Sequence, residues 1–131
     1  MGEKEVSKVL KDQFGIEKIP FRFKAMGKGR IYAYRDCFHE IDEYHSGVYL
    51  GRIERDGFRL SIEGCYLLKD QLKKNVKEIN FSDMLKWLKG EDIKGEERGY
   101  IILKWRDYYL GCGKGDGSKI RNFVPKDRRI R

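Results

Sequence analysis

The sequence predicts an α+β fold in which a small mixed β pseudo-barrel with two short helices follows a helix-plus-hairpin unit. Three observations lead to this expectation. Short runs rich in β-branched and aromatic residues recur along the 131 residues, with turn signals between them. Only a few short segments space their apolar residues as a helix does. Hydrophobic residues make up 40% of the chain, enough for a core, so the 38% charged content indicates a solvated surface rather than disorder.

Residues 1–44 are expected to form the small N-terminal α/β unit. A helix is predicted over residues 4–14, and the glycine that follows it is a stop signal. The apolar residues of this helix share one face: Val6, Val9, Leu10 and Phe14. Alternating residues over 21–26 and 31–34, on either side of two glycines, predict a β-hairpin.

Residues 45–131 are expected to form the second domain, which begins with another hairpin. Two short strands over 48–53 and 58–61 flank an Asp-Gly turn, which is a strong hairpin signal. Ser61 is placed to cap a helix that runs towards Leu72. Three apolar residues of this helix are expected to face inward: Tyr66, Leu67 and Leu68.

A second short helix is expected after a brief strand over residues 76–79. The helix is predicted to start at Ser82 and to end at Gly90. Its buried stripe is predicted to consist of Phe81, Leu85 and Leu88. The polar stretch 91–98 is expected to be a loop.

The end of the chain carries its strongest β signal. Residues 100–105 and 108–112 predict two strands joined by a tight turn. Glycines over 113–118 predict a flexible turn, and residues 119–124 predict a last strand closed by Pro125. The final four or five residues are expected to be a tail.

Positive charge gathers at the same end of the chain. The net charge is +8, and residues 98–131 hold ten basic residues against three acidic ones, or +7. The other 97 residues hold 19 basic and 18 acidic residues, or +1. A concentrated field of this sign attracts polyanions, either phosphodiester backbones or anionic lipid.

The last predicted strand sorts its residues by parity. Lys119, Arg121 and Phe123 are expected on one face, with an apolar set on the other. The alternative is a solvated tail of like charge. Aromatic residues that could stack on unpaired bases lie nearby, although most are expected in the core: Trp105, Tyr108 and Tyr109. The residues expected to contact phosphates are Lys104, Lys114, Lys119, Arg121, Lys126, Arg128 and Arg129, and those expected to hydrogen-bond bases or backbone are Arg59 and Asn122.

The glycine-rich segment 110–115 does not predict a cofactor site. A loop that binds a dinucleotide or an adenosyl group must open a helix and lead into further βα units, and only 16 residues follow Gly115. A P-loop needs Ser or Thr after its lysine, whereas Lys114 precedes a glycine. Turns that require positive φ explain these glycines, so no cofactor is expected.

The cysteines and histidines predict neither a disulfide framework nor a metal site. Cys37, Cys65 and Cys112 are odd in number and widely spaced. His39 and His45 lie among acidic residues, but their spacing fits no zinc signature, so this segment is expected to be an acidic linker. No motif pairs a nucleophile with a base. The sequence shows no signal peptide and no apolar run of membrane length, which favours the cytoplasm and no membrane partner.

Residues 99–114 and 120–126 resemble the closing hairpin of a PUA domain. The pattern is a strand, a leucine-glycine-x-glycine-lysine turn and an asparagine-aromatic-x-proline-lysine end. It is similar above all to the PUA-like tail of the Fmu/Sun family of RNA cytosine-5 methyltransferases, and to short archaeal ribosome-biogenesis proteins that carry this tail alone. Together with residues 57–64 and 87–92, the resemblance covers 45–131.

The resemblance implies a pseudo-barrel of mixed strands with a helix beside an RNA groove, and a role in recognising rRNA or tRNA. The family's catalytic domain has no counterpart in the sequence, so its activity is not expected. We expect a non-catalytic RNA-binding protein in ribosome biogenesis, rRNA processing or RNA modification, with an RNA-modifying enzyme or pre-ribosomal proteins as partners in trans. The alternatives are a protein adaptor and a small-molecule-binding or enzymatic member of the wider barrel superfamily.

Overall fold

The computed structural model describes residues 3–34 and 47–130, and the chain divides into two compact units, Met1–Lys74 and Asn75–Arg131. This division differs from the expected boundary after residue 44. The hairpin over 48–60 belongs to the first unit because its first strand pairs with the strand before residue 35. Within the described ranges, no helix combines the length and the apolar character needed to cross a membrane. The acidic linker predicted around His39 and His45 lies outside the described residues.

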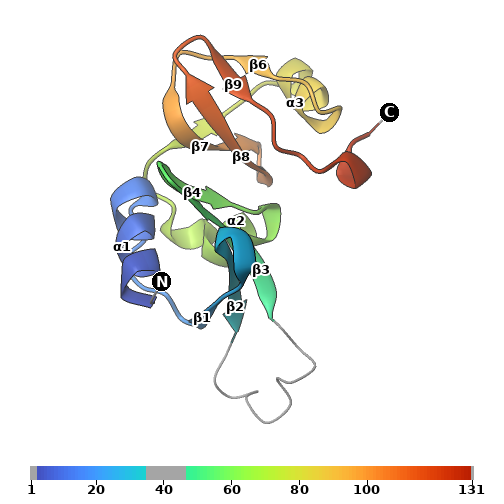
Figure 1. Ribbon diagram of the computed structural model, residues 1–131. Coiled ribbons are helices and arrows are strands. Elements are labelled where there is room, and N and C mark those ends of the chain that lie inside the picture. Colours follow the sequence, from blue (N-terminus) through green and yellow to red (C-terminus); the bar gives the residue numbers. More distant parts are fainter. Residues whose placement is uncertain (1–2, 35–46, 131) are drawn as a thin grey trace. The chain divides into compact units, whose positions relative to one another are not determined.

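The first unit consists of a four-stranded antiparallel sheet and two helices (Figure 1). The strands are hydrogen-bonded in the order β1-β2-β3-β4, so each pairs with its neighbour in the chain. Short 3-10 turns lie at Gly27–Gly29 and Lys69–Gln71. The elements are α1 (Glu3–Phe14), β1 (Arg22–Ala25), β2 (Arg30–Tyr34), β3 (Val48–Glu54), β4 (Gly57–Leu60) and α2 (Ile62–Leu68).

Helix α1 confirms the predicted amphipathic helix. Val6, Leu10 and Phe14 are all buried. The helix is also fixed to β4 by two hydrogen bonds, because the side-chain amide of Gln13 donates to the Phe58 carbonyl (2.6 Å) and accepts from the Phe58 amide (2.9 Å). Helix α1 is therefore held in place both by burial of its apolar face and by hydrogen bonds to β4, an edge strand of the sheet.

Helix α2 corrects one prediction. Ser61 caps it as expected, accepting a 2.8 Å hydrogen bond from the amide of Gly64. Of the three residues predicted to face inward, Leu68 is buried, together with Cys65, whereas Tyr66 and Leu67 are 40% and 43% exposed. Consecutive helical residues point about 100° apart, so three in a row cannot share one buried face. The helix also ends at Leu68, before the predicted end near 72.

The second unit is a five-stranded mixed sheet that curls into a half-barrel around one helix. Its strand order is β5-β7-β8-β9-β6, with β5 parallel to β7 and the other pairs antiparallel. The elements are β5 (Val76–Glu78), α3 (Phe81–Leu88), β6 (Ile93–Lys94), β7 (Arg98–Trp105), β8 (Tyr108–Asp116), β9 (Lys119–Arg121) and a 3-10 turn at Lys126–Arg128. The predicted α+β class, with a small mixed β barrel, is confirmed.

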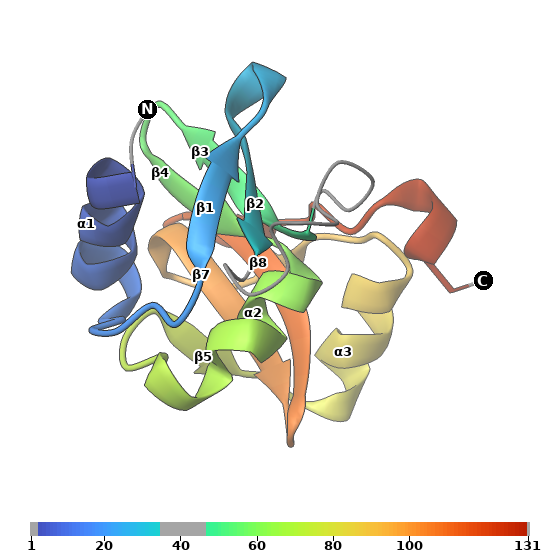
Figure 2. The same ribbon diagram turned by 90° about the horizontal axis from the view of Figure 1, so that it is seen from below.

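Helix α3 is anchored by residues other than the predicted ones. It begins at Phe81, and Asn80 caps it by accepting a 2.8 Å hydrogen bond from the Asp83 amide. Met84 and Trp87 are buried, whereas Phe81 is 56% exposed. The Trp87 indole donates to the Leu110 carbonyl at 3.0 Å, which holds α3 alongside β8 (Figure 2). Of the predicted stripe, Leu85 and Leu88 pack partly buried against the core, whereas Phe81 does not, because burial of the largest side chain, Trp87, sets the orientation of the helix.

Gly113 and Gly115 belong to a strand, and only Gly117 lies in a turn, so the first part of the predicted flexible turn over 113–118 is wrong. β8 continues to Asp116, and Gly115 pairs with Gly99 of β7. A Cβ at Gly113 would lie 2.5 Å from the Trp87 ring, and one at Gly115 would lie 2.1 Å from the Glu97 carbonyl oxygen. These positions need glycine because neighbouring atoms approach closely.

Two further boundaries in this unit differ from prediction. β6 lies inside the stretch 91–98 that was expected to be a loop, since Ile93 pairs with Ile120. β9 ends at Arg121, so the last strand is shorter than the predicted 119–124. Two residues of pairing are too few to leave a periodic signal in a sequence.

Candidate nucleic-acid interface

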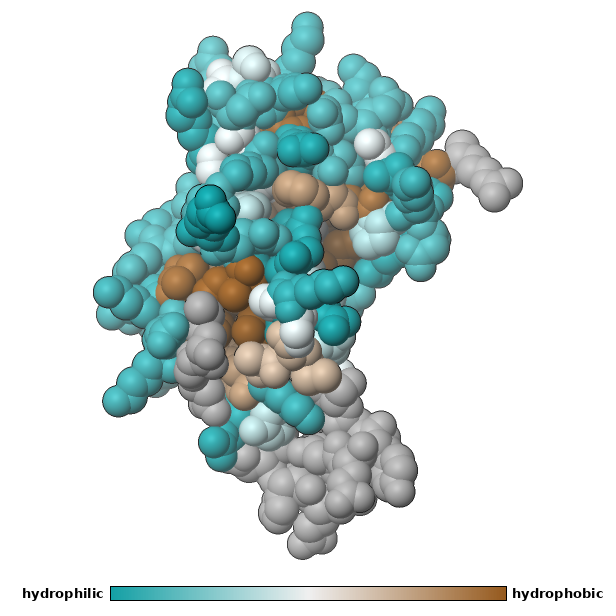
Figure 3. Space-filling view, in the orientation of Figure 1, coloured by the Kyte–Doolittle hydropathy of each residue, from teal (hydrophilic) through white to brown (hydrophobic). Residues whose placement is uncertain are grey.

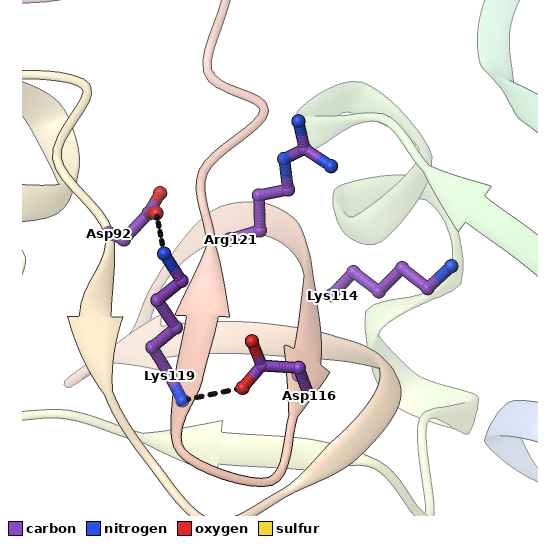
Figure 4. A pocket seen from close by; sticks show the side chains of 6 residues that line it. Asp92, Lys114, Asp116, Lys119 and Arg121 are labelled. Atoms are coloured by element: carbon purple, nitrogen blue, oxygen red, sulfur yellow. Dashed lines mark hydrogen bonds and ion pairs between the residues drawn. The ribbon is translucent and has the colours of Figure 1, made fainter.

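A pocket of about 390 Å³ lies where β8 and β9 pair, next to the segment that leads into β6 (Figure 4). Five of its six lining residues are charged: Asp92, Lys114, Asp116, Lys119 and Arg121, with Gly115 as the sixth. Ile120 belongs to the core beneath α3, so its strand neighbours Lys119 and Arg121 face the other side of the sheet. Figure 3 shows that hydrophilic residues cover most of the visible face of this unit.

Lys114 and Arg121 bring two positive charges side by side. They are direct cross-strand partners in the β8–β9 register, and Figure 4 shows their side chains leaving adjacent strands with diverging ends. Like charges opposite each other destabilise a sheet, so folding alone does not favour this pair. The Lys114 ammonium lies 5.5 Å from the centre of the Tyr100 ring. Arg121 is exposed, and no hydrogen bond or ion pair to its guanidinium occurs among the described residues.

Lys119 differs from these two because a carboxylate partly neutralises it. Its ammonium lies 3.6 Å from Asp92, and its side chain is 58% exposed. The other carboxylate oxygen of Asp92 accepts a 2.8 Å hydrogen bond from the backbone amide of Asn122. Asp92 therefore fixes the β6 side of the pocket and lowers the net positive charge at Lys119.

Asp116 closes the β8–β9 turn. One of its carboxylate oxygens accepts from the Ser118 amide (2.9 Å), the Ser118 hydroxyl (2.9 Å) and the Lys119 amide (3.0 Å). These hydrogen bonds, led by that of the Lys119 amide, lower the pKa of Asp116 from 3.8 to about 2. The carboxylate thus serves the scaffold and stays ionised at neutral pH.

The low pKa of Asp116 gives a pH prediction. A carboxyl group whose pKa is lower in the folded state stabilises that state above the unfolded pKa, and this contribution disappears as pH falls through the folded pKa. We expect the turn to lose this contribution between about pH 4 and pH 2. An NMR titration of the Asp116 carboxyl carbon checks the value directly. A midpoint at the ordinary aspartate pKa of 3.8 would contradict the hydrogen-bonded turn.

A second basic region lies beside α3. It consists of three residues that were predicted to contact phosphates: Lys126, Arg128 and Arg129. Arg129 is bound to the scaffold, because its Nε donates to the Val124 carbonyl at 3.0 Å and its side chain packs over Gly90. The Ile130 amide donates to the Leu88 carbonyl at 2.9 Å. The expected loose tail of four or five residues is thus held against the helix as far as Ile130. Lys126 and Arg128 are exposed.

Three other predicted contacts lie elsewhere or are already engaged. Asn122 donates to the carbonyls of Trp87 and Glu91 (2.8 Å each) and accepts from the Val124 amide (2.7 Å), so its amide joins α3 to the strand end. Lys104 is on β7, and its ammonium lies 5.5 Å from the centre of the Tyr109 ring on β8. Arg59 is on β4 in the first unit, 3.5 Å from Glu54. RNA contact by these three residues stays a prediction.

Sequence reasoning missed Asp92 and Tyr100 as neighbours of the basic residues. Asp92 fell in a stretch that was expected to be a loop, and nothing in its local sequence indicates an ion pair 27 residues away. Tyr100 was expected only as a strand residue. Its position opposite Lys114 depends on the register of β7 and β8, which the turn between them sets.

Comparison with known proteins shows that the second unit is similar to a known family of domains. Residues 74–130 match the family described as the methyltransferase RsmF PUA domain, a range that nearly coincides with the unit Asn75–Arg131. The α+β fold of this unit is accordingly PUA-like. The part of the predicted resemblance over 45–73 lies outside the match.

Several curated relatives carry the name ribosomal RNA small subunit methyltransferase F. The protein of Aeromonas hydrophila is 27% identical over 84 residues, which cover 62% of this chain and 18% of the relative. That of Photobacterium profundum is 27% identical over 96 residues (71% and 20%), and that of Shewanella woodyi is 31% identical over 77 residues (56% and 16%). The chain thus spans no more than a fifth of the length of these relatives.

Proposed function

We propose that this protein binds RNA through the pocket between β8 and β9, and that it acts on rRNA, or on tRNA, in RNA modification or ribosome biogenesis without performing chemistry itself. The observation that carries the proposal is the cross-strand pair of Lys114 and Arg121, in which the exposed guanidinium has no anionic partner among the described residues. The match to a PUA domain of proteins named for ribosomal RNA supports the choice of ligand.

The chemistry of the pocket suits a phosphodiester backbone. The planar guanidinium of Arg121 can donate two parallel hydrogen bonds to one phosphate, while Lys114 supplies a point charge beside it. Asp92 on the β6 side and Asp116 at the β8–β9 turn repel phosphates, which directs the backbone towards Lys114 and Arg121. Binding of this kind releases counterions and weakens as salt increases.

The lining of the pocket argues against a small-molecule ligand. Pockets for such ligands are mostly apolar with a few polar groups, whereas five of the six lining residues here are charged. The lining of this pocket therefore does not favour the small-molecule alternative. In the proposed role the protein works in the cytoplasm, in the stand-alone form of a PUA-like tail, and an RNA-modifying enzyme or pre-ribosomal proteins act with it in trans.

Crosslinking in cells tests this proposal. The full-length protein is crosslinked with ultraviolet light and purified under denaturing conditions, and the attached RNA is sequenced. We expect rRNA or tRNA fragments well above the background of the Lys114→Ala/Arg121→Ala variant. Recovery of no RNA, together with an acidic protein partner, would favour the adaptor alternative.

A further inference from the structure

Three aromatic rings gather where α3 begins and where β7 turns into β8. This aromatic cluster consists of Phe81, Trp105 and Tyr108. The ring centres of Phe81 and Trp105 are 5.7 Å apart, and those of Trp105 and Tyr108 are 6.0 Å apart with planes only 17° from parallel. Phe81 is 56% and Tyr108 59% exposed, which leaves much aromatic surface in water.

A basic residue covers part of the aromatic cluster. The Arg106 guanidinium lies 4.8 Å from the centre of the Trp105 ring. Arg106 has a φ of 53°, a left-handed conformation that is unfavourable for a non-glycine residue. Glycine or asparagine would adopt this conformation with less strain, so the backbone of the turn does not explain why an arginine stands at this position. Aromatic faces beside planar cations are what single-stranded nucleic acids stack against.

The opposite end of α3 carries positive charge. From Phe81 to the Lys89 cap the helix rises about 12 Å. The basic region next to this end includes the exposed side chains of Lys126 and Arg128, and the Ile130–Leu88 hydrogen bond holds that region against the helix. A stacked strand spans 12 Å in about three to four nucleotides at 3.4 Å each.

We infer that the aromatic cluster stacks on an unpaired RNA base while Lys126 and Arg128 contact the backbone three to four nucleotides away. This inference rests on the proposed function and narrows its ligand to RNA with a single-stranded segment. The surface is distinct from the pocket, which lies on the face of the sheet away from α3. Charge favours RNA over a protein as the occupant, because residues 75–131 hold 14 Lys and Arg against 9 Asp and Glu.

Binding of matched oligonucleotides to the full-length protein tests the inference. The probes are a fluorescein-labelled ten-nucleotide single-stranded RNA and the same sequence annealed into a duplex. Tyr108→Ala is expected to weaken single-strand binding about fivefold or more, and to leave duplex binding and the salt dependence unchanged. The control is Tyr66→Ala, which removes a tyrosine of 40% exposure from the first unit.

Tryptophan fluorescence gives a second readout. A base stacked on the aromatic cluster quenches Trp105, whereas Trp87 is fully buried, so Trp105→Phe should abolish the quenching. Equal single-strand binding by Tyr108→Ala and the wild type, without quenching, would overturn the inference and leave the cluster as a protein-docking surface. The proposed function survives that result if Lys114 and Arg121 still determine affinity. It fails as well if the wild type binds no RNA.

Discussion

Replacing Lys114 and Arg121 with alanine together should weaken single-stranded RNA binding about 25-fold at 0.1 M salt. For a single strand, each phosphate contact contributes about 0.7 to the slope of log K against log salt. One contact therefore raises the affinity about fivefold between 1 M and 0.1 M salt, and two contacts raise it about 25-fold. The fold should not suffer, because the two side chains are like charges opposite each other on a sheet. Fluorescence anisotropy with labelled RNA measures the affinities.

Two controls separate the pocket from general charge. Lys24→Ala/Lys69→Ala removes two exposed charges from the first unit and should change affinity far less. Lys119→Ala should have a smaller effect than Arg121→Ala, because Asp92 already compensates the Lys119 charge. If Lys24→Ala/Lys69→Ala weakens binding as much as the pocket variant, the pocket is not the binding site.

Trp87→Ala should destabilise the protein by about 3–5 kcal/mol, the range for deleting a fully buried aromatic side chain. The substitution removes the indole from the core beneath the sheet and leaves the Leu110 carbonyl without its 3.0 Å donor. Urea unfolding of the full chain, followed by circular dichroism, measures the change. Trp87→Phe should cost less, since it keeps most of the ring.

Trp105→Ala is the matched comparison for Trp87→Ala. Trp105 is only partly buried against the same core, so its removal should cost clearly less. An equal loss of stability in the two variants would mean that Trp87 does not anchor α3 in the way its burial and hydrogen bond indicate.

Much of the fold follows from local patterns in the sequence. The apolar spacing of Val6, Leu10 and Phe14 defines α1 because a helix repeats every 3.6 residues. Alternation and turn signals likewise locate the strands of both hairpins. Parity within 119–121 correctly separates the buried Ile120 from the exposed Lys119 and Arg121.

The remaining features depend on contacts between distant parts of the chain. The orientation of α3 follows from the fit of Trp87 against Gly113, 26 positions later. The same contact explains why glycines that look like a turn form a strand. At the candidate site, composition shows where the positive charge lies in the chain but not which basic side chains have a carboxylate partner. The folded register decides this, because it places Lys119 next to Asp92 and Arg121 next to Lys114.

The salt dependence of RNA binding tests the central claim most directly. The slope of log K against log salt is measured for the wild type and for Arg121→Ala with the same single-stranded RNA. Contact between Arg121 and a phosphate predicts a slope that is shallower by about 0.7 in the variant. Identical slopes, or wild-type binding that does not respond to salt, would contradict the account of this pocket as a phosphate-binding RNA site.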